Sequence, residues 1–522
     1  MGSSGRLKVF GVVAAAVCVL GAGIAAGGTQ EGFLTAKDGT LLKDGQPFSV
    51  RAACCDPAVG HWYKFKGPWF ETGLRKCEVY GFNAMRTWVP GTGGEESTAT
   101  FNAWRKDRDA FYREFDSVFI AQCKAKGVYL ILTFTPMATG AERGDVYDVS
   151  SDAYRSWKEF LQDFCGHYKN ETQILFWEVA NEYRGEDNDL PGTRRFYEQA
   201  AADMNAADPN HLISSGVDGG MHWPDTAEAR KGWVNINASK GINITSIHTY
   251  TNDPWTYNWH TERDYARAVR GMVSAARELC KPLFLGEFGA EARLTANGEN
   301  PEIVWFMKAI IREGIPAYGF HWFYPEPEAG LFRVIPELSP HTAQWMKELN
   351  AYAAAGKEVP ADFGPKTTDY AFPICSDEKP FSGPPAVTRG AVTVKADAEL
   401  FGEAAPSLGV TWQKGGASVE LGPFHPNDLS EYREAGGTFS FVLHGDARPP
   451  QAFRVAMVDA AGKSAAADAV RVTELKGGWV RVEVPLESFA IDWAQWQGVR
   501  IEFGADTSGS INVDDFKIAC GK

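Results

Sequence analysis

The chain has 522 residues, enough for a barrel of about 300 residues followed by a second domain. A net charge of −14 argues against a nucleic-acid partner, because proteins that bind nucleic acids present basic surfaces. Aromatic residues make up 13% of the chain, which is more than a core needs and leaves some rings for exposed positions.

Residues 1–28 are predicted to be a secretory signal. Arg6 and Lys8 give a positive start, residues 9–20 are apolar, and the small residues 25–28 suit cleavage. The alternative is a retained membrane anchor, but the apolar run is shorter than the ~20 residues that a span needs. The prediction is a secreted protein, extracellular or periplasmic, with no membrane association after cleavage.

Residues 29–355 alternate short apolar runs with longer amphipathic segments, the rhythm of βα units around a buried parallel sheet. Eight apolar runs occur, at residues 48–53, 82–89, 128–134, 174–180, 212–217, 244–250, 283–288 and 317–323. Eight repeats predict an α/β fold closed into a (β/α)8 TIM barrel rather than an open doubly wound sheet. No glycine-rich nucleotide-binding motif follows the first run, so no nucleotide cofactor is expected.

After residue 355 the composition and the pattern of apolar residues change. Residues 356–388 are rich in proline and are predicted to be a linker, and residues 389–522 show the short alternating runs of an antiparallel β-sandwich. Eight cysteines remain after the signal, an even number that permits disulfides whose pairing the sequence does not reveal. No Cys/His zinc spacing and no HExxH motif occur, so no metal is predicted.

Two barrel runs end in carboxylates. The fourth run ends in Asn181-Glu182 and the seventh in Glu287. Catalytic groups of such barrels project from the carboxyl ends of the strands, and strands four and seven lie on opposite sides of the ring. Glu182 and Glu287 are therefore expected to face each other across the barrel mouth.

These residues carry a family resemblance. The segments 177–182 (Trp-Glu-Val-Ala-Asn-Glu) and 286–289 (Gly-Glu-Phe-Gly) resemble the acid/base and nucleophile signatures of glycoside hydrolase clan A, and most closely family 5. The similarity covers roughly residues 33–355. It implies hydrolysis with retention of anomeric configuration, with Glu182 as general acid/base and Glu287 as nucleophile. Carboxyl groups about 5–5.5 Å apart are expected for that mechanism.

The same resemblance implies a set of substrate-binding and supporting residues, namely Arg86, Asn181, His248, Tyr250 and Trp322. Considered without the motif, Arg86 could equally be part of a structural ion pair, and His248 could equally be a histidine of the hydrophobic core. Glu178 is expected to be structural, because side chains alternate along a strand. The third run ends in Leu132-Thr133-Phe134-Thr135 where many family members have a histidine, which leaves the subfamily open.

A polysaccharide substrate is predicted from aromatic residues in the expected loops: Trp62, Tyr63, Trp69, Trp88, Trp223, Trp255, Tyr257, Trp259 and Tyr324. The signature motif and the His-Trp-Tyr segment after the first run resemble mannanases, which favours β-1,4-mannan. A β-1,4-glucan is the main alternative, and a non-catalytic glycan-binding protein is a third. Endo or exo action and the oligomeric state stay open.

The C-terminal region resembles the galactose-binding-like jelly rolls of carbohydrate-binding modules. The resemblance rests on segments 484–501 and 511–516. Its candidate sugar platforms are Trp412, Tyr432, Trp493 and Trp496. A purely structural role for this domain is an equally open alternative.

Overall fold

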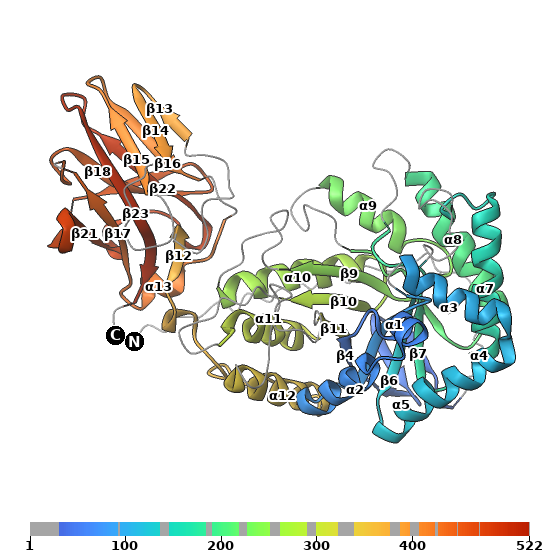
Figure 1. Ribbon diagram of the computed structural model, residues 1–522. Helices are drawn as coiled ribbons and strands as arrows, with labels where there is room; N and C mark the ends of the chain where they lie inside the picture. Colours follow the sequence, from blue (N-terminus) through green and yellow to red (C-terminus); the bar gives the residue numbers. More distant parts are fainter. Residues whose placement is uncertain are drawn as a thin grey trace, which may run out of the picture.

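Eight parallel strands form a barrel in the first part of the chain (Figure 1). The computed structural model describes residues 31–91, 94–135, 146–183, 190–218, 227–250, 261–289, 299–321, 339–375, 387–396, 407–422, 426–445, 447–468 and 470–520. The barrel strands are β4 (Val50–Cys54), β5 (Ala84–Val89), β6 (Tyr129–Phe134), β7 (Ile174–Glu178), β8 (Leu212–Ser214), β9 (Thr245–Tyr250), β10 (Leu283–Gly289) and β11 (Ala317–His321). Each coincides with one of the eight predicted runs, so the predicted barrel is confirmed.

The strands pair in the order β8-β7-β6-β5-β4-β11-β10-β9, and a parallel bridge between Ser214 and Ile244 joins the two ends. Most strand residues are buried on both faces. This explains why the strands read as continuous apolar runs rather than as an alternation.

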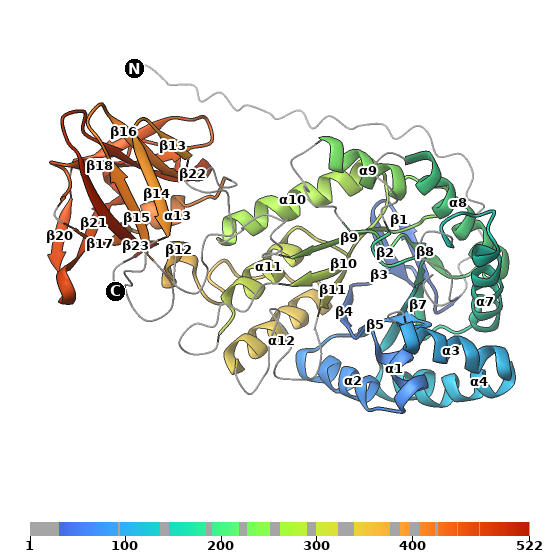
Figure 2. The same cartoon turned by 45° about the horizontal axis from the view of Figure 1, so that its top comes forward.

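Helices surround the sheet in both views (Figures 1 and 2). They are α1 (Ala58–Phe65), α2 (Trp69–Tyr80), α3 (Gly94–Lys106), α4 (Arg108–Phe115), a π-helical turn (Asp116–Ile120), α5 (Ala121–Lys126), α7 (Asp152–Tyr168), α8 (Leu190–Ala207), α9 (Ala227–Asn237), α10 (Glu262–Glu278), α11 (Pro301–Arg312) and α12 (Pro340–Ala354). Helix α7 shows why such segments are helical. Ser151 caps its first turn by accepting from Tyr154 N, and its buried residues recur every three or four positions. None of the described helices is long and apolar enough to cross a membrane.

A small antiparallel sheet closes the amino-terminal end of the barrel. Strands β1 (Leu34–Lys37), β2 (Thr40–Lys43) and β3 (Gln46–Pro47) form it. Leu34 and Leu41 pack in one buried cluster with inward-facing residues of the barrel, including Val50 and Phe284. With this end closed by apolar side chains, the open end is the one formed by the carboxyl ends of the strands.

The second domain is a β-sandwich of two antiparallel sheets. One sheet contains β14 (Val392–Ala396), β15 (Leu408–Trp412), β23 (Gly509–Ala519), β17 (Thr438–His444), β21 (Trp479–Pro485) and β20 (Arg471–Glu474), with β12 (Phe372–Cys375) paired to β23. The other contains β13 (Val387–Arg389), β16 (Ala417–Leu421), β22 (Trp496–Phe503), β18 (Phe453–Asp459) and β19 (Ser464–Ala467). The predicted sandwich is confirmed.

Two sequence-based expectations for this half need correction. The segment predicted as a linker, 356–388, contains β12, which joins the sandwich sheet through pairing with β23. The proline-rich pattern could not show a pairing with a strand more than a hundred residues later. The four candidate platforms, Trp412, Tyr432, Trp493 and Trp496, are all 1–3% exposed and lie in the sandwich core. Periodicity alone does not say which face of a strand an aromatic side chain occupies.

The sandwich is docked on helix α10 through charged and polar contacts. Arg263 lies 2.9 Å from Glu434 and 3.4 Å from Glu431 of helix α13 (Ser430–Glu434). The buried carboxylate of Asp264 accepts from the backbone N–H of Asp428 at 2.8 Å. The Tyr432 hydroxyl donates to the carbonyl of Thr367 in the connecting segment at 3.1 Å. The two cores are separate, but their contact surface is specific.

Two truncations are expected to behave differently because the connecting segment packs on the barrel. Val359 lies in the barrel core, and the Trp305 indole donates to the carbonyl of Pro365 at 2.8 Å. A chain ending at residue 371 keeps these contacts, whereas one ending at 355 loses them. We expect both to fold and the shorter one to melt lower by about 5 °C in calorimetry. Equal melting temperatures would show that the segment contributes nothing to the barrel.

Candidate active site

Polar and charged side chains lie together at the open end of the barrel, where the parallel strands finish. They come from six of the eight strands or from the residues directly after them: Asp56, Arg86, Glu178, Asn181, Glu182, His248, Tyr250, Glu287 and His321. Catalytic groups of (β/α)8 barrels lie at this end. The sequence-predicted residues Arg86, Asn181, Glu182, His248, Tyr250 and Glu287 are brought together here, and Trp322 lies outside the described residues.

Arg86 is the centre of the cluster and is completely buried. Its guanidinium donates to Glu178 Oε2 at 2.6 Å and to Glu287 Oε1 at 2.8 Å. The third donor, Nη2, reaches Asn181 Oδ1 at 2.9 Å. Burial lowers the pKa of Arg86, but the charges of Glu178 and Glu287 outweigh it and raise the pKa well above its usual value. The guanidinium therefore stays charged and fixes both carboxylates.

Glu287, on β10, is surrounded by donors. Besides the bond from Arg86 to Oε1, the Tyr250 hydroxyl donates to Oε2. Burial by itself raises the pKa of this carboxyl. The charges of His248, His321 and Arg86 act in the opposite direction and prevail, so the pKa lies well below the usual glutamate range. The lowered pKa favours the ionised form of Glu287, the form that a nucleophile needs.

Glu182 occupies a more open position just after β7. Its side chain is 37% exposed, against 5% for Glu287. Its φ of +53° is in the left-handed region, and its backbone N–H donates to the carbonyl of Gly216 at 2.9 Å. Gly216 itself needs to be glycine, because a Cβ there would lie 1.9 Å from the Ala180 carbonyl. A strained backbone held by its neighbours is typical of functional positions.

The two carboxylates are close to each other. His248 Nδ1 lies 2.9 Å from Glu182 Oε1 and 3.5 Å from Glu287 Oε1. One ligand atom from each of the three residues lies within 4.8 Å of the other two. Burial lowers the pKa of His248, but Glu287 and Glu182 outweigh it and raise the pKa. His248 is thus not a core histidine. It lies between the two carboxylates that the sequence singled out.

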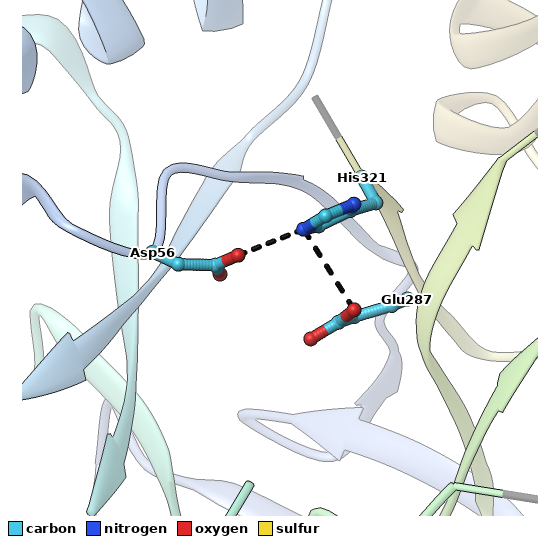
Figure 3. A group of neighbouring side chains, drawn as sticks. All are labelled: Asp56, Glu287 and His321. Carbon is cyan, nitrogen blue, oxygen red and sulfur yellow. Dashed lines mark hydrogen bonds and ion pairs between the residues drawn. The ribbon is translucent and has the colours of Figure 1, made fainter. Parts of the chain in front are cut away.

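Sequence reasoning missed Asp56 and His321. His321 ends β11 and its Nε2 lies 2.8 Å from Asp56 Oδ2 and 3.7 Å from Glu287 Oε2 (Figure 3). Both follow the rule that found the other residues, since each stands at the carboxyl end of a barrel strand. Neither residue belongs to a recognisable motif. Only their position at the ends of strands marks them as candidates.

Glu178, expected to be structural, is buried beneath the cluster and supports it. In addition to Arg86, it accepts from the Thr133 hydroxyl at 2.6 Å and from the Ser214 hydroxyl at 3.3 Å. Thr133 is on β6, one residue before the strand ends. Here that strand contributes a hydroxyl that orients the partner of Arg86.

Two groups in the cluster have the donor atoms of a metal site. They are Asp56, Glu287 and His321, and Glu182, His248 and Glu287. Both contain Glu287, which already accepts a 2.8 Å charge-assisted bond from Arg86. A cation bound there would be repelled by the buried guanidinium, so the arrangement fits a charge network better than a metal ion.

The predicted aromatic platforms are only partly within the described residues. Trp62 and Tyr63 lie on α1 and are partly buried, donating to Glu114 at 2.9 Å and to the Phe111 carbonyl at 3.2 Å. They attach α1 to α4 rather than forming free platforms. Trp223, Trp255, Tyr257, Trp259 and Tyr324 lie outside the described residues.

Comparison with known proteins gives the family. Residues 41–324, more than half of the chain, match the family described as cellulase (glycosyl hydrolase family 5). The chain belongs to glycosyl hydrolase family 5. As a member of this family it is a glycosidase, and the cluster of carboxylates at the barrel mouth is its candidate active site.

The chain is similar to several named proteins. The probable mannan endo-1,4-beta-mannosidase C of Aspergillus terreus is 26% identical over 250 residues, which cover 38% of this chain and 61% of that protein, less than two thirds of its length. Mannan endo-1,4-beta-mannosidase 3 of Solanum lycopersicum is 25% identical, covering 54% of this chain and 78% of that protein. The solved endo-beta-1,4-mannanase of Thermotoga petrophila is 14% identical with a TM-score of 0.49, covering 89% of this chain and 99% of that one.

Proposed function

We propose that this family 5 hydrolase is a retaining endo-β-glycosidase that cleaves β-1,4-mannan, with Glu287 as nucleophile and Glu182 as general acid/base. The observation that carries the mechanism is the closeness of the two carboxylates, since one oxygen of Glu182 lies within 4.8 Å of one oxygen of Glu287. Retaining enzymes need about 5–5.5 Å between the carboxyl groups, whereas inverting ones need about 6.5–9.5 Å to admit a water.

The first step follows from the surroundings of Glu287. Oε1 accepts a charged bond from Arg86, while Oε2 accepts from the neutral Tyr250 phenol, which leaves Oε2 the better nucleophile. Oε2 attacks the anomeric carbon and forms a glycosyl ester as the glycosidic C–O bond breaks. Glu182 in its protonated form donates its proton to the departing oxygen, which leaves as a neutral hydroxyl.

The second step reverses the roles at the same atoms. The Glu182 carboxylate takes a proton from a water, and the resulting hydroxyl attacks the anomeric carbon from the side that the leaving group vacated. The ester bond breaks and returns its electron pair to Glu287, whose charge is again stabilised by Arg86. Two inversions give net retention.

Mannan is proposed as the substrate because the named relatives are mannan endo-1,4-β-mannosidases. The alternative is a β-1,4-glucan, in keeping with the cellulase description of the family. We expect the wild-type enzyme to release a ladder of short oligosaccharides from soluble mannan and to act far less on carboxymethylcellulose or xylan. Product sizing by chromatography checks this. Faster cleavage of carboxymethylcellulose than of mannan would replace the proposed substrate, and release of monosaccharide alone would replace endo action.

The role of Glu182 predicts a dependence on the leaving group. Glu182→Ala is expected to lower kcat/KM by at least about 100-fold on mannan but by much less on dinitrophenyl β-glycosides, whose leaving group needs little protonation. Azide should raise the turnover of the dinitrophenyl substrate, because it can attack the glycosyl ester without a general base. A loss that is equal on both substrates would assign Glu182 another role.

The proposal also covers export of the protein and the role of the sandwich domain. We propose that residues 1–28 direct secretion, as their basic start and apolar run suggest. The described thiols Cys54, Cys55, Cys77, Cys123, Cys165 and Cys520 are free, and five of them are buried, where oxidants reach them poorly. For the sandwich we propose a structural role, since its four candidate platforms are core residues and it is docked on α10.

A further inference from the structure

Asp56 is held in a fixed position beside the nucleophile. It follows β4, is 8% exposed, and its backbone carbonyl accepts from Trp88 N at 3.0 Å and from the Thr87 hydroxyl at 3.2 Å. Its carboxylate has one oxygen near Arg86 Nη1, at 3.5 Å, and the other near His321 Nε2, at 2.8 Å. Asp56 therefore touches the two cationic residues that stand on either side of Glu287.

The His321 ring is oriented by two carboxylates. Its Nε2 faces Asp56 Oδ2 at 2.8 Å and Glu287 Oε2 at 3.7 Å, as Figure 3 shows. A nitrogen lone pair pointing at two carboxylates would be repelled by both, so Nε2 carries a hydrogen. At these distances the hydrogen bond goes to Asp56, and Glu287 receives only the charge of the ring.

The electrostatic surroundings of His321 agree with this geometry. Burial lowers its pKa, but the charges of Glu287 and Asp56 and the hydrogen bond to Asp56 outweigh burial and raise the pKa. Arg86 acts in the opposite sense. Tyr250 also faces the ring, with its ring centre 5.5 Å away in an edge contact.

We propose that Asp56 is a positioning residue: it holds the Nε2–H of His321 so that the imidazole faces Glu287 Oε2 without hydrogen-bonding to it. The oxygen then keeps a lone pair for attack on the anomeric carbon. Without Asp56, the ring is free to close the 3.7 Å gap and donate directly to Oε2. That bond would withdraw charge from the nucleophile and slow glycosyl-ester formation, while it would stabilise the carboxylate released in the second step.

The pairing is tested without turnover. We label the histidines with ¹⁵N, assign His321 by the signal lost in His321→Gln, and follow its ring nitrogens by NMR as the pH changes. Asp56→Asn, which keeps an acceptor oxygen but no charge, is expected to lower the His321 titration midpoint by about 1 pH unit or more. An unchanged His321 titration midpoint in Asp56→Asn would overturn the proposal, and this result does not depend on which substrate the enzyme hydrolyses.

The consequence for catalysis rests on the proposed function and is tested by kinetics. Asp56→Ala is expected to lower kcat/KM, which reports ester formation, by up to about 100-fold on a substrate with a poor leaving group. The kcat on a dinitrophenyl β-glycoside, limited by ester hydrolysis, should fall by less than about 10-fold. Asp56→Asn should lose less kcat/KM than Asp56→Ala, because its amide oxygen still accepts from Nε2. Equal losses in the two variants, or in the two steps, would overturn the proposal.

Asp208 offers a matched control for loss of a buried Asp–His pair. Its carboxylate lies 2.6 Å from His211 Nδ1, both side chains are 0% exposed, and it precedes β8 at the opposite end of the barrel. Asp208→Asn should lower the melting temperature and leave kcat/KM unchanged. If it reproduced the kinetic pattern of Asp56→Ala, general destabilisation would account for both. A wild-type enzyme without glycosidase activity would refute the proposed function and leave the NMR result to decide the pairing.

Discussion

Replacement of Glu287 by alanine is expected to lower kcat by at least about 10⁴-fold on every substrate, whatever its leaving group. The reason is that no other described carboxylate stands where it can form the ester. Glu182 lies close by, but it follows a different strand, and its Oε1 is 2.9 Å from His248 Nδ1. Steady-state assays on mannan and on dinitrophenyl β-glycosides measure the loss.

External azide separates this variant from an unfolded one. Azide can occupy the space left by the carboxylate and attack the anomeric carbon once, so it should restore turnover with an inverted product and never a retained one. Glu313→Ala, which removes an outer carboxylate paired with Arg270 at 3.1 Å, should leave kcat unchanged. A Glu287→Ala enzyme within about 10-fold of wild type would remove Glu287 from its proposed role.

The second large effect concerns Arg86. Arg86→Met removes a charge 2.8 Å from Glu287, so the pKa of that carboxyl should rise from its lowered position. Because the reaction needs Glu287 ionised, the acidic limb of the kcat/KM profile should move to higher pH. The rate at the optimum should also fall by about 100-fold or more, since both carboxylates that Arg86 orients are released. Profiles of kcat/KM against pH measure both effects.

Two further variants make the result interpretable. Arg86→Met leaves Glu178 buried without its cation, which costs about 3–5 kcal/mol in stability for a buried pair, so Arg86→Met combined with Glu178→Gln serves as the folded control. Arg86→Lys keeps the charge but lacks the planar guanidinium whose three nitrogens reach three different residues, so it should restore the pKa better than the rate. An acidic limb that does not move in a folded Arg86→Met enzyme would contradict the electrostatic role.

The parts of this protein that sequence predicted are those with local signals. Each barrel strand is a short apolar run, and Glu182 and Glu287 stand in motifs directly at the strand ends. Barrel closure then brings the two carboxylates together, and the family resemblance implies Arg86 and Tyr250 beside Glu287.

The parts that sequence did not predict depend on partners far along the chain. Asp56 and His321 are 265 residues apart, and each is an ordinary residue until β4 and β11 pair. The pairing of β12 with β23 also joins residues far apart in the chain, so the local pattern of β12 predicts only a linker. Trp412 and Trp496 were candidate platforms because an aromatic residue in a strand fits a core or a surface equally well.

The central claim, that Glu287 forms a covalent glycosyl ester, is tested most directly by trapping it. A 2-deoxy-2-fluoro-β-mannosyl fluoride slows both steps but carries a good leaving group, so the ester should accumulate on the enzyme. Peptide mass spectrometry after proteolysis is then expected to find one fluoromannosyl group, attached to Glu287 in the peptide that contains it. A label on Glu182 or another residue, or hydrolysis of mannan with an inverted first product and no label, would contradict the account.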